Sequence, residues 1–165
     1  MASSSKQDDL VYNRYSKGKL ESKLAYHGEY KPYFEYIADC LKKYSSQRDK
    51  QKGEAFVHGF TLAMTSQNKF YRPISELDND GGYADIFLSP LCDIYKDMVD
   101  SYIIELKYCK SQTTDEQVKK LFEEASAQIS RYADSDTVRE AVKTTKLRKL
   151  VVIYRGAEMV ACEEI

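Results

Sequence analysis

Two acidic residues and a lysine lie in stretches of the sequence that otherwise have the character of buried strands. Asp85 interrupts the apolar run "YADIFLSP", and Glu105 and Lys107 close the apolar run "SYIIELKY". Alternation of side chains along a strand places Glu105 and Lys107 on one face, and places Asp85 on the same face as Phe87. A carboxylate in such a strand is costly to bury unless a hydrogen bond, an ion pair or a bound cation compensates its charge.

These residues could form a metal site if the two strands are neighbours, because Asp85 and Glu105 would then converge. Two carboxylates completed by water are typical ligands of Mg²⁺. Lys107 could orient or deprotonate a water molecule, or neutralise charge on a phosphoryl group. Glu54 precedes the apolar Val57 by three residues in a predicted helix. We therefore expect Glu54 on or beside the buried stripe of that helix, where it could hold a water or the metal.

Each of the four residues also has a purely structural explanation. Asp85 could be a hydrogen-bond acceptor at a strand end, and Glu105 and Lys107 could form an ordinary ion pair. Glu54 could be a solvated helix residue. Only the combination of the four favours a functional site.

Apolar periodicity and turn residues predict helices and strands in the order α-α-β-β-β-α-(α)-β-β. The turn "DNDGG" favours a hairpin between the first two strands, and Pro73 favours an edge position for the first. A strand, a long helix and another strand predict one right-handed crossover in a mixed sheet, hence an α/β domain with helices on both faces. The predicted helices cover about residues 29–45, 48–64, 114–133 and 137–142, and the predicted strands cover about 70–77, 83–90, 101–108, 149–155 and 158–164.

The composition of the 165 residues is that of one globular domain, with 42% hydrophobic and 31% charged residues. The formal net charge of −1 gives no global attraction for nucleic acid or anionic lipid. No apolar run has the length of a membrane span or of a secretory signal, so no membrane association is expected. The scattered cysteines lack metal-ligand spacing and predict a reduced, cytoplasmic protein. The 14 tyrosines are explained by helix packing, with base stacking as the alternative.

The segments "GGYADIFLSP", "SYIIELKY" and "EEASAQISRYA" resemble, in this order, the PD-(D/E)xK nuclease superfamily. More narrowly, they resemble the nuclease-like C-terminal domain of AAA-ATPase-like bacterial proteins that are common in Bacteroidetes. The resemblance covers roughly residues 50–165, and more loosely the chain from about residue 28. It implies a restriction-endonuclease-like αβββαβ core, in which helices flank a mixed central sheet. The expected division is a flexible or partly helical N-terminal lead-in over 1–27 and a nuclease-like domain over 28–165.

The resemblance also implies roles for individual residues. Asp85 takes the place of the motif aspartate, with Ala84 where the family often has proline. Glu105 takes the place of the motif (D/E) and Lys107 that of the motif lysine. The expected catalytic residues are Asp85, Glu105, Lys107, Glu54 and Gln128, and the expected metal ligands are Asp85 and Glu105.

The activity that the resemblance implies is metal-dependent hydrolysis of phosphodiester bonds in nucleic acid, with DNA as the expected substrate and Mg²⁺ or Mn²⁺ as the cofactor. The chain is then expected to belong to a longer ATPase-containing protein, and a homodimer is a further expectation. Basic residues of the last third could form a phosphate track, or an ordinary solvated surface. A catalytically inactive module that binds nucleic acid or protein, and an enzyme for another phosphate ester, remain alternatives. The expected substrate contacts are Tyr132, Arg131, Lys110, Arg148 and Lys149.

Overall fold

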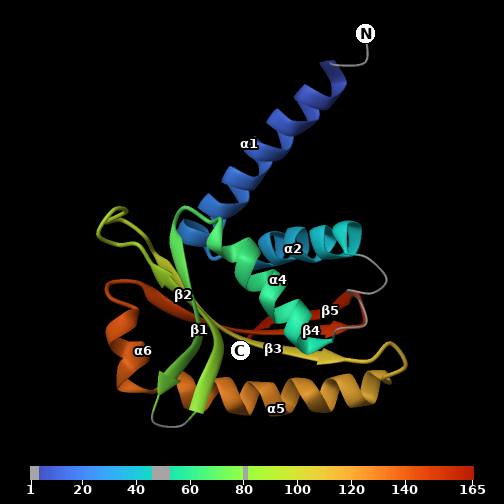
Figure 1. The fold of residues 1–165 in the computed structure, drawn as a ribbon. Coiled ribbons are helices and arrows are strands. Elements are labelled where there is room, and N and C mark those ends of the chain that lie inside the picture. Colours follow the sequence, from blue (N-terminus) through green and yellow to red (C-terminus); the bar gives the residue numbers. More distant parts are fainter. Residues whose placement is uncertain (1–3, 46–52, 80–81) are drawn as a thin grey trace.

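A five-stranded mixed sheet forms the centre of the computed structural model, which describes the backbone of residues 4–45, 53–79 and 82–165 (Figure 1). The strands lie in the order of the chain. Neighbours are antiparallel except for the parallel third and fourth strands. The prediction of a mixed sheet is confirmed, and Pro73 lies on an edge strand as expected. The strands are β1 (Tyr71–Asn79), β2 (Gly82–Pro90), β3 (Asp100–Cys109), β4 (Lys146–Arg155) and β5 (Glu158–Glu164).

Helices cover both faces of this sheet, as predicted. The α1, α2 and α4 helices pack on one face, whereas α5 and α6, which connect β3 to β4, pack on the other (Figure 1). None of the helices in the described part of the chain is long and apolar enough to cross a lipid bilayer. The helices are α1 (Ser4–His27), α2 (Tyr30–Tyr44), α4 (Glu54–Ser66), α5 (Asp115–Ala133) and α6 (Asp136–Ala141).

Strand alternation divides the core into two layers. In β3, Ile104 and Leu106 belong to the apolar cluster under α1, α2 and α4, whereas Ile103 belongs to the cluster under α5 and α6. Because side chains alternate, Glu105 and Lys107 share the α5 face with Ile103. The apolar residues of β3 that pack against the two helical layers therefore also determine on which face of the sheet its charged residues lie.

Several of the tyrosines are core residues. Tyr71 and Tyr102 are buried, and their rings pack edge to face with centroids 5.9 Å apart. Each hydroxyl donates to a main-chain carbonyl, Tyr71 to Asp100 at 2.7 Å and Tyr102 to Leu24 at 2.6 Å. The packing explanation holds for these residues, because a buried ring that is hydrogen-bonded at its tip cannot stack on a base.

Element boundaries differ from the predictions mainly before the sheet. The α4 helix begins at Glu54, because Gly53 has a φ of 69° that is incompatible with a continuous helix. The earlier part of the helix predicted from residue 48 lies, through residue 52, outside the described residues. Likewise, two residues of the predicted "DNDGG" turn, 80 and 81, lie outside them. The α1 helix runs from Ser4, so helix extends through the lead-in that was expected to be flexible or partly helical.

The α5 helix has a complete N-terminal cap. The Thr114 hydroxyl accepts a hydrogen bond from the Gln117 amide at 3.3 Å, and the Gln117 side chain accepts one from the Thr114 amide at 3.0 Å. This reciprocal arrangement is a capping box, which fixes the first turn of the helix. The cap fixes the start of α5. From there the helix runs back across β3, and Gln128 contacts Lys107 of that strand.

Candidate active site

Strands β2 and β3 separate beside the predicted site. In the described backbone they pair only over Ile86–Leu88 and Tyr102–Ile104. One residue beyond the last pair, the Asp85 side chain replaces the missing strand contact: its Oδ2 accepts a hydrogen bond from the Leu106 amide at 2.8 Å. The two strands are thus neighbours, as the metal-site hypothesis requires, and the Asp85 carboxylate lies at the peptide that joins Glu105 to Leu106.

Glu105 is a fully buried carboxylate with a single polar partner. Its exposed fraction is 0%, and the Lys107 ammonium lies 2.7 Å from Oε1, the distance of a charge-assisted hydrogen bond. Oε2 accepts no hydrogen bond from any described residue. Burial raises the pKa of Glu105 to about 7, against the attraction of Lys107 and with help from the negative charges of Asp85 and Glu54.

Lys107 is held between Glu105 and the α5 helix. Its Nζ donates to Gln128 Oε1 at 3.2 Å, and Gln128 Nε2 in turn donates to the Tyr132 hydroxyl at 2.8 Å. Partial burial acts to lower the pKa of Lys107, but the ion pair with Glu105 and the charges of Asp85 and Glu54 outweigh it, so the pKa is raised. At neutral pH the side chain is therefore an ammonium, which donates hydrogen bonds but has no lone pair to accept a proton.

Glu54 reaches the same region from the opposite layer. It is the first residue of α4 and is exposed, which departs from the expectation that it would lie along the buried stripe that contains Val57. The reason is its position at the helix end, where the chain turns away at Gly53. Glu54 lines an open pocket of about 420 Å³, whose other lining residues are Ala55, His58 and Asp85.

A comparison with protein-family models decides the classification of this arrangement. A model described as the PD-(D/E)XK nuclease superfamily matches residues 52–164, which is more than half of the chain. The protein belongs to this superfamily. The match begins just before α4 and ends in β5, so it contains every element that positions the site. No curated protein and no solved structure matches the chain significantly.

PD-(D/E)XK nucleases generally use divalent metal ions, and the donor set of this chain fits one. Glu105 Oε2 accepts no hydrogen bond from the described residues and Oε1 faces only Lys107, so both oxygens are acceptors that a cation would satisfy. Mg²⁺ is typically held by one or two carboxylates with several waters, so Asp85 and Glu105 suffice. The described residues contain no group of three or more His, Cys, Asp or Glu side chains that could hold a metal ion.

The predicted substrate contacts lie at different distances from this centre. Tyr132 is 6% exposed and lies behind Gln128, so it contacts the site through that amide. Arg131 is exposed on α5, and Lys110 is exposed directly after β3. Lys149 is partly exposed on β4, opposite Ile103. The structure gives these three basic residues no contact with the carboxylates.

Arg148 is engaged elsewhere. It is paired with Tyr102, near the start of β3, and its Nε donates to the buried Asp100 at 2.7 Å. Its Nη1 donates to Glu164 at 2.8 Å. Its guanidinium also packs against Gly28, where a Cβ would collide with it. The structure therefore uses Arg148 to join the loop between α1 and α2 to the sheet, and does not bring it to the carboxylates.

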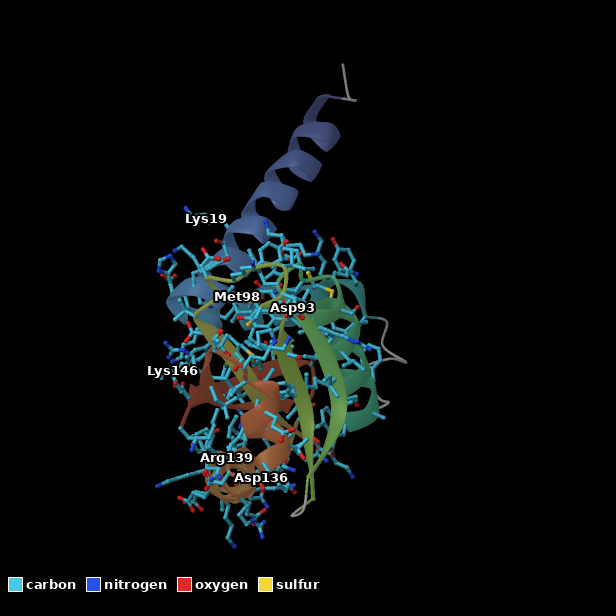
Figure 2. The ribbon with its side chains drawn as sticks, turned by 90° about the vertical axis from the view of Figure 1, so that its left-hand side faces the viewer. Lys19, Asp93, Met98, Asp136, Arg139 and Lys146 are labelled. Atoms are coloured by element: carbon cyan, nitrogen blue, oxygen red, sulfur yellow. The ribbon has the colours of Figure 1, made fainter. Side chains whose placement is uncertain are left out.

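Other basic residues of the expected phosphate track are also paired with acids. Arg139 lies 3.5 Å from Asp136 in α6, and both are visible at the lower end of Figure 2. Lys143 pairs with Asp93 at 3.2 Å. In addition, Arg155 donates to Asp115 at 2.7 Å. The basic stretch of the sequence is thus interrupted by acidic partners from other elements, and does not form an uninterrupted positive stripe.

His58 is a residue of the site that the sequence did not single out. Its Nε2 lies 3.1 Å from the main-chain oxygen of Asp85. The only signal in the sequence is its spacing of four residues from Glu54, which places both side chains on one face of the helix. A spacing of four residues is common in helices, so it identifies His58 only once the packing of α4 against the sheet is known.

Proposed function

We propose that the protein hydrolyses phosphodiester bonds of nucleic acid, with DNA as its substrate and a divalent cation held by Asp85 and Glu105. The observation that supports this most directly is the buried Glu105 carboxylate, whose Oε2 has no hydrogen-bond donor among the described residues and whose Oε1 has only the Lys107 ammonium, 2.7 Å away. Burying a carboxylate lowers stability. A bound cation would offset this cost.

Bound Mg²⁺ or Mn²⁺ would supply a Lewis acid for a phosphate oxygen and a more acidic water. Asp85 and Glu105 provide its protein ligands. Because the pKa of Lys107 is raised, we assign it the stabilisation of negative charge on the phosphoryl group, in preference to the deprotonation of water. Gln128 holds the ammonium in place, since its Oε1 accepts from Lys107 and its Nε2 is fixed by Tyr132. Glu54 is an exposed residue that lines the pocket with Asp85, and we assign it a bound water.

A catalytically inactive binding module is the alternative, and one observation favours it. Lys107 already neutralises Glu105, so the fold does not require a cation to compensate this carboxylate. The attached ATPase domain, the homodimer, the bacterial origin and the cytoplasmic location stay predictions.

The experiment is a cleavage assay with the full chain. Labelled single- and double-stranded DNA and RNA are incubated with Mg²⁺, with Mn²⁺ or with EDTA, and metal binding is measured by calorimetry. Glu105→Gln and Lys107→Met keep the shape of each side chain and remove its charge. The matched controls are Glu140→Gln and Lys19→Met, at exposed positions in α6 and α1 (Figure 2 labels Lys19).

We expect metal-dependent cleavage that falls by about 100-fold or more in both site variants and is unchanged in both controls. Cleavage that persists in both site variants would refute the assigned site. Absence of cleavage together with absence of metal binding would favour the inactive module. Cleavage of RNA alone would replace the proposed substrate and leave the site assignment intact.

A further inference from the structure

His58 makes the contact that joins the helix of Glu54 to the strand of Asp85. Its ring is partly buried on α4, one turn after Glu54, and its Nε2 lies 3.1 Å from the main-chain oxygen of Asp85. Ser75 Oγ on β1 lies 3.5 Å from the same nitrogen. A carbonyl oxygen only accepts hydrogen bonds, so Nε2 must carry the proton. The contact therefore also fixes which ring nitrogen is protonated.

Asp85 is consequently fixed at two points. Its side chain accepts from the Leu106 amide on β3, and its main chain accepts from His58 on α4. It lies one residue beyond the last β2–β3 pair, where the described strands no longer hold each other. The pairing of β2 with β1 continues on both sides of Asp85, at Ala84 and Ile86, so the two hydrogen bonds add contacts with β3 and α4 to a main chain that β1 already holds.

We propose that His58 is a positioning residue, which links α4 to the Asp85 main chain and so holds the Asp85 carboxylate where it and Glu105 would bind the divalent cation. The inference rests on the proposed function, since it concerns the same cation. It assigns no contact between His58 and the cation, because the ring nitrogen that faces Asp85 is a donor. Loss of the hydrogen bond should then weaken metal binding more than it weakens the fold.

The test uses three variants of His58 and one control. Gln places an amide nitrogen close to the position of Nε2, so His58→Gln keeps the donor. His58→Asn shortens the reach, and His58→Ala removes the donor. The chain has two histidines, and the exposed His27 at the end of α1 provides the control, His27→Ala. Mn²⁺ affinity is measured by calorimetry, alongside the thermal midpoint without metal and the kcat and KM for DNA cleavage.

We expect Mn²⁺ to bind about tenfold more weakly to the Ala and Asn variants, which corresponds to about 1.4 kcal/mol. The Gln and His27 variants should bind within twofold of the wild type. The Ala and Asn variants should lose kcat with little change in the KM for DNA, because the ligand position changes and the substrate surface does not. Nitrogen-15 spectra of the imidazole rings, assigned with His27→Ala, should show a proton on Nε2 of His58.

Failure of this inference is distinguishable from failure of the proposed function. If Glu105→Gln abolishes Mn²⁺ binding while the Ala and Asn variants of His58 bind like the wild type, only the role of His58 is overturned. It is also overturned if the Gln variant is as weak as Ala, or if the His58 proton lies on Nδ1. If the wild type binds no Mn²⁺, the proposed function and the role of His58 are both refuted. A nitrogen-15 spectrum that still shows a proton on Nε2 of His58 would then mean that the residue serves only packing.

Discussion

The buried carboxyl of Glu105 should make the stability of the metal-free protein fall as the pH rises from about 4 to about 8. Its pKa is raised from 4.5 in the unfolded chain to about 7 in the folded protein, chiefly by burial. Below about pH 4 the group is protonated in both states and costs nothing. Between the two pKa values the unfolded chain loses its proton and the folded protein keeps it, so the free energy of unfolding decreases. Above about pH 7 the full penalty of about 3 kcal/mol applies.

Glu105→Gln resembles the protonated form and removes the penalty. We expect the difference in unfolding free energy between this variant and the wild type to grow by about 3 kcal/mol, in favour of the variant, from pH 4 to pH 8.5. The raised pKa of Lys107 belongs to the wild type, where Glu105 is its main cause. In the variant Gln128 still accepts from the ammonium, and the negative charges of Asp85 and Glu54 still favour its charged form. The measurement is urea denaturation in EDTA at closely spaced pH values.

Glu140→Gln is the matched control, since Glu140 is exposed on α6. Its unfolding free energy relative to the wild type should stay within about 0.5 kcal/mol over the same range. A constant difference between Glu105→Gln and the wild type would show that Glu105 ionises normally in the folded protein. The argument from burial would then be wrong, and with it the main observation behind the cation site.

Three further outcomes are expected. Mg²⁺ at millimolar concentration should raise the thermal midpoint of the wild type at pH 8.5 and not that of Glu105→Gln, because only the ionised carboxylate is a ligand; equal shifts would place the ion elsewhere. Arg148→Met should destabilise the protein by about 3–5 kcal/mol in urea, since it leaves the Asp100 carboxylate buried and unpaired, whereas a loss of DNA affinity without a loss of stability would make Arg148 a substrate contact. Thr114→Ala should cost about 1 kcal/mol of unfolding free energy by removal of the cap, and Thr114→Ser should restore most of it if the hydroxyl is responsible.

The sequence predicted the parts of the site that depend on local periodicity. Alternation in "SYIIELKY" is sufficient to put Glu105 and Lys107 on one face, because Ile104 and Leu106 occupy the opposite core. The sequence left open whether the strand of Asp85 lies beside that of Glu105, and the pairing of β2 with β3 in the structure answers this. The resemblance located Gln128, whose contact with Lys107 requires only that α5 run back across the strand that precedes it.

The rest depends on contacts between residues far apart in the chain. Arg148 belongs to a basic stretch of the sequence, yet its partner Asp100 lies 48 residues earlier and is completely buried. No residue near Arg148 in the sequence predicts this pairing. His58 contacts a main-chain carbonyl, which every residue has, so no residue type marks the partner. The exposure of Glu54 follows from the positive φ of Gly53, which overrides the helical pattern expected to continue through it.

The two buried acids of β3 differ in their partners, which fits a structural role for Asp100 and the proposed cation-binding role for Glu105. Asp100 accepts a hydrogen bond from Arg148, which is a fixed partner from the adjacent strand. Glu105 has only the ion pair with Lys107, on its own strand, and that ammonium also donates to Gln128. A proton, the ammonium and a divalent cation can therefore compete for the Glu105 carboxylate. Because burial raises its pKa to about 7, this carboxyl changes its protonation state near neutral pH, as expected of a group that exchanges a proton for the proposed cation.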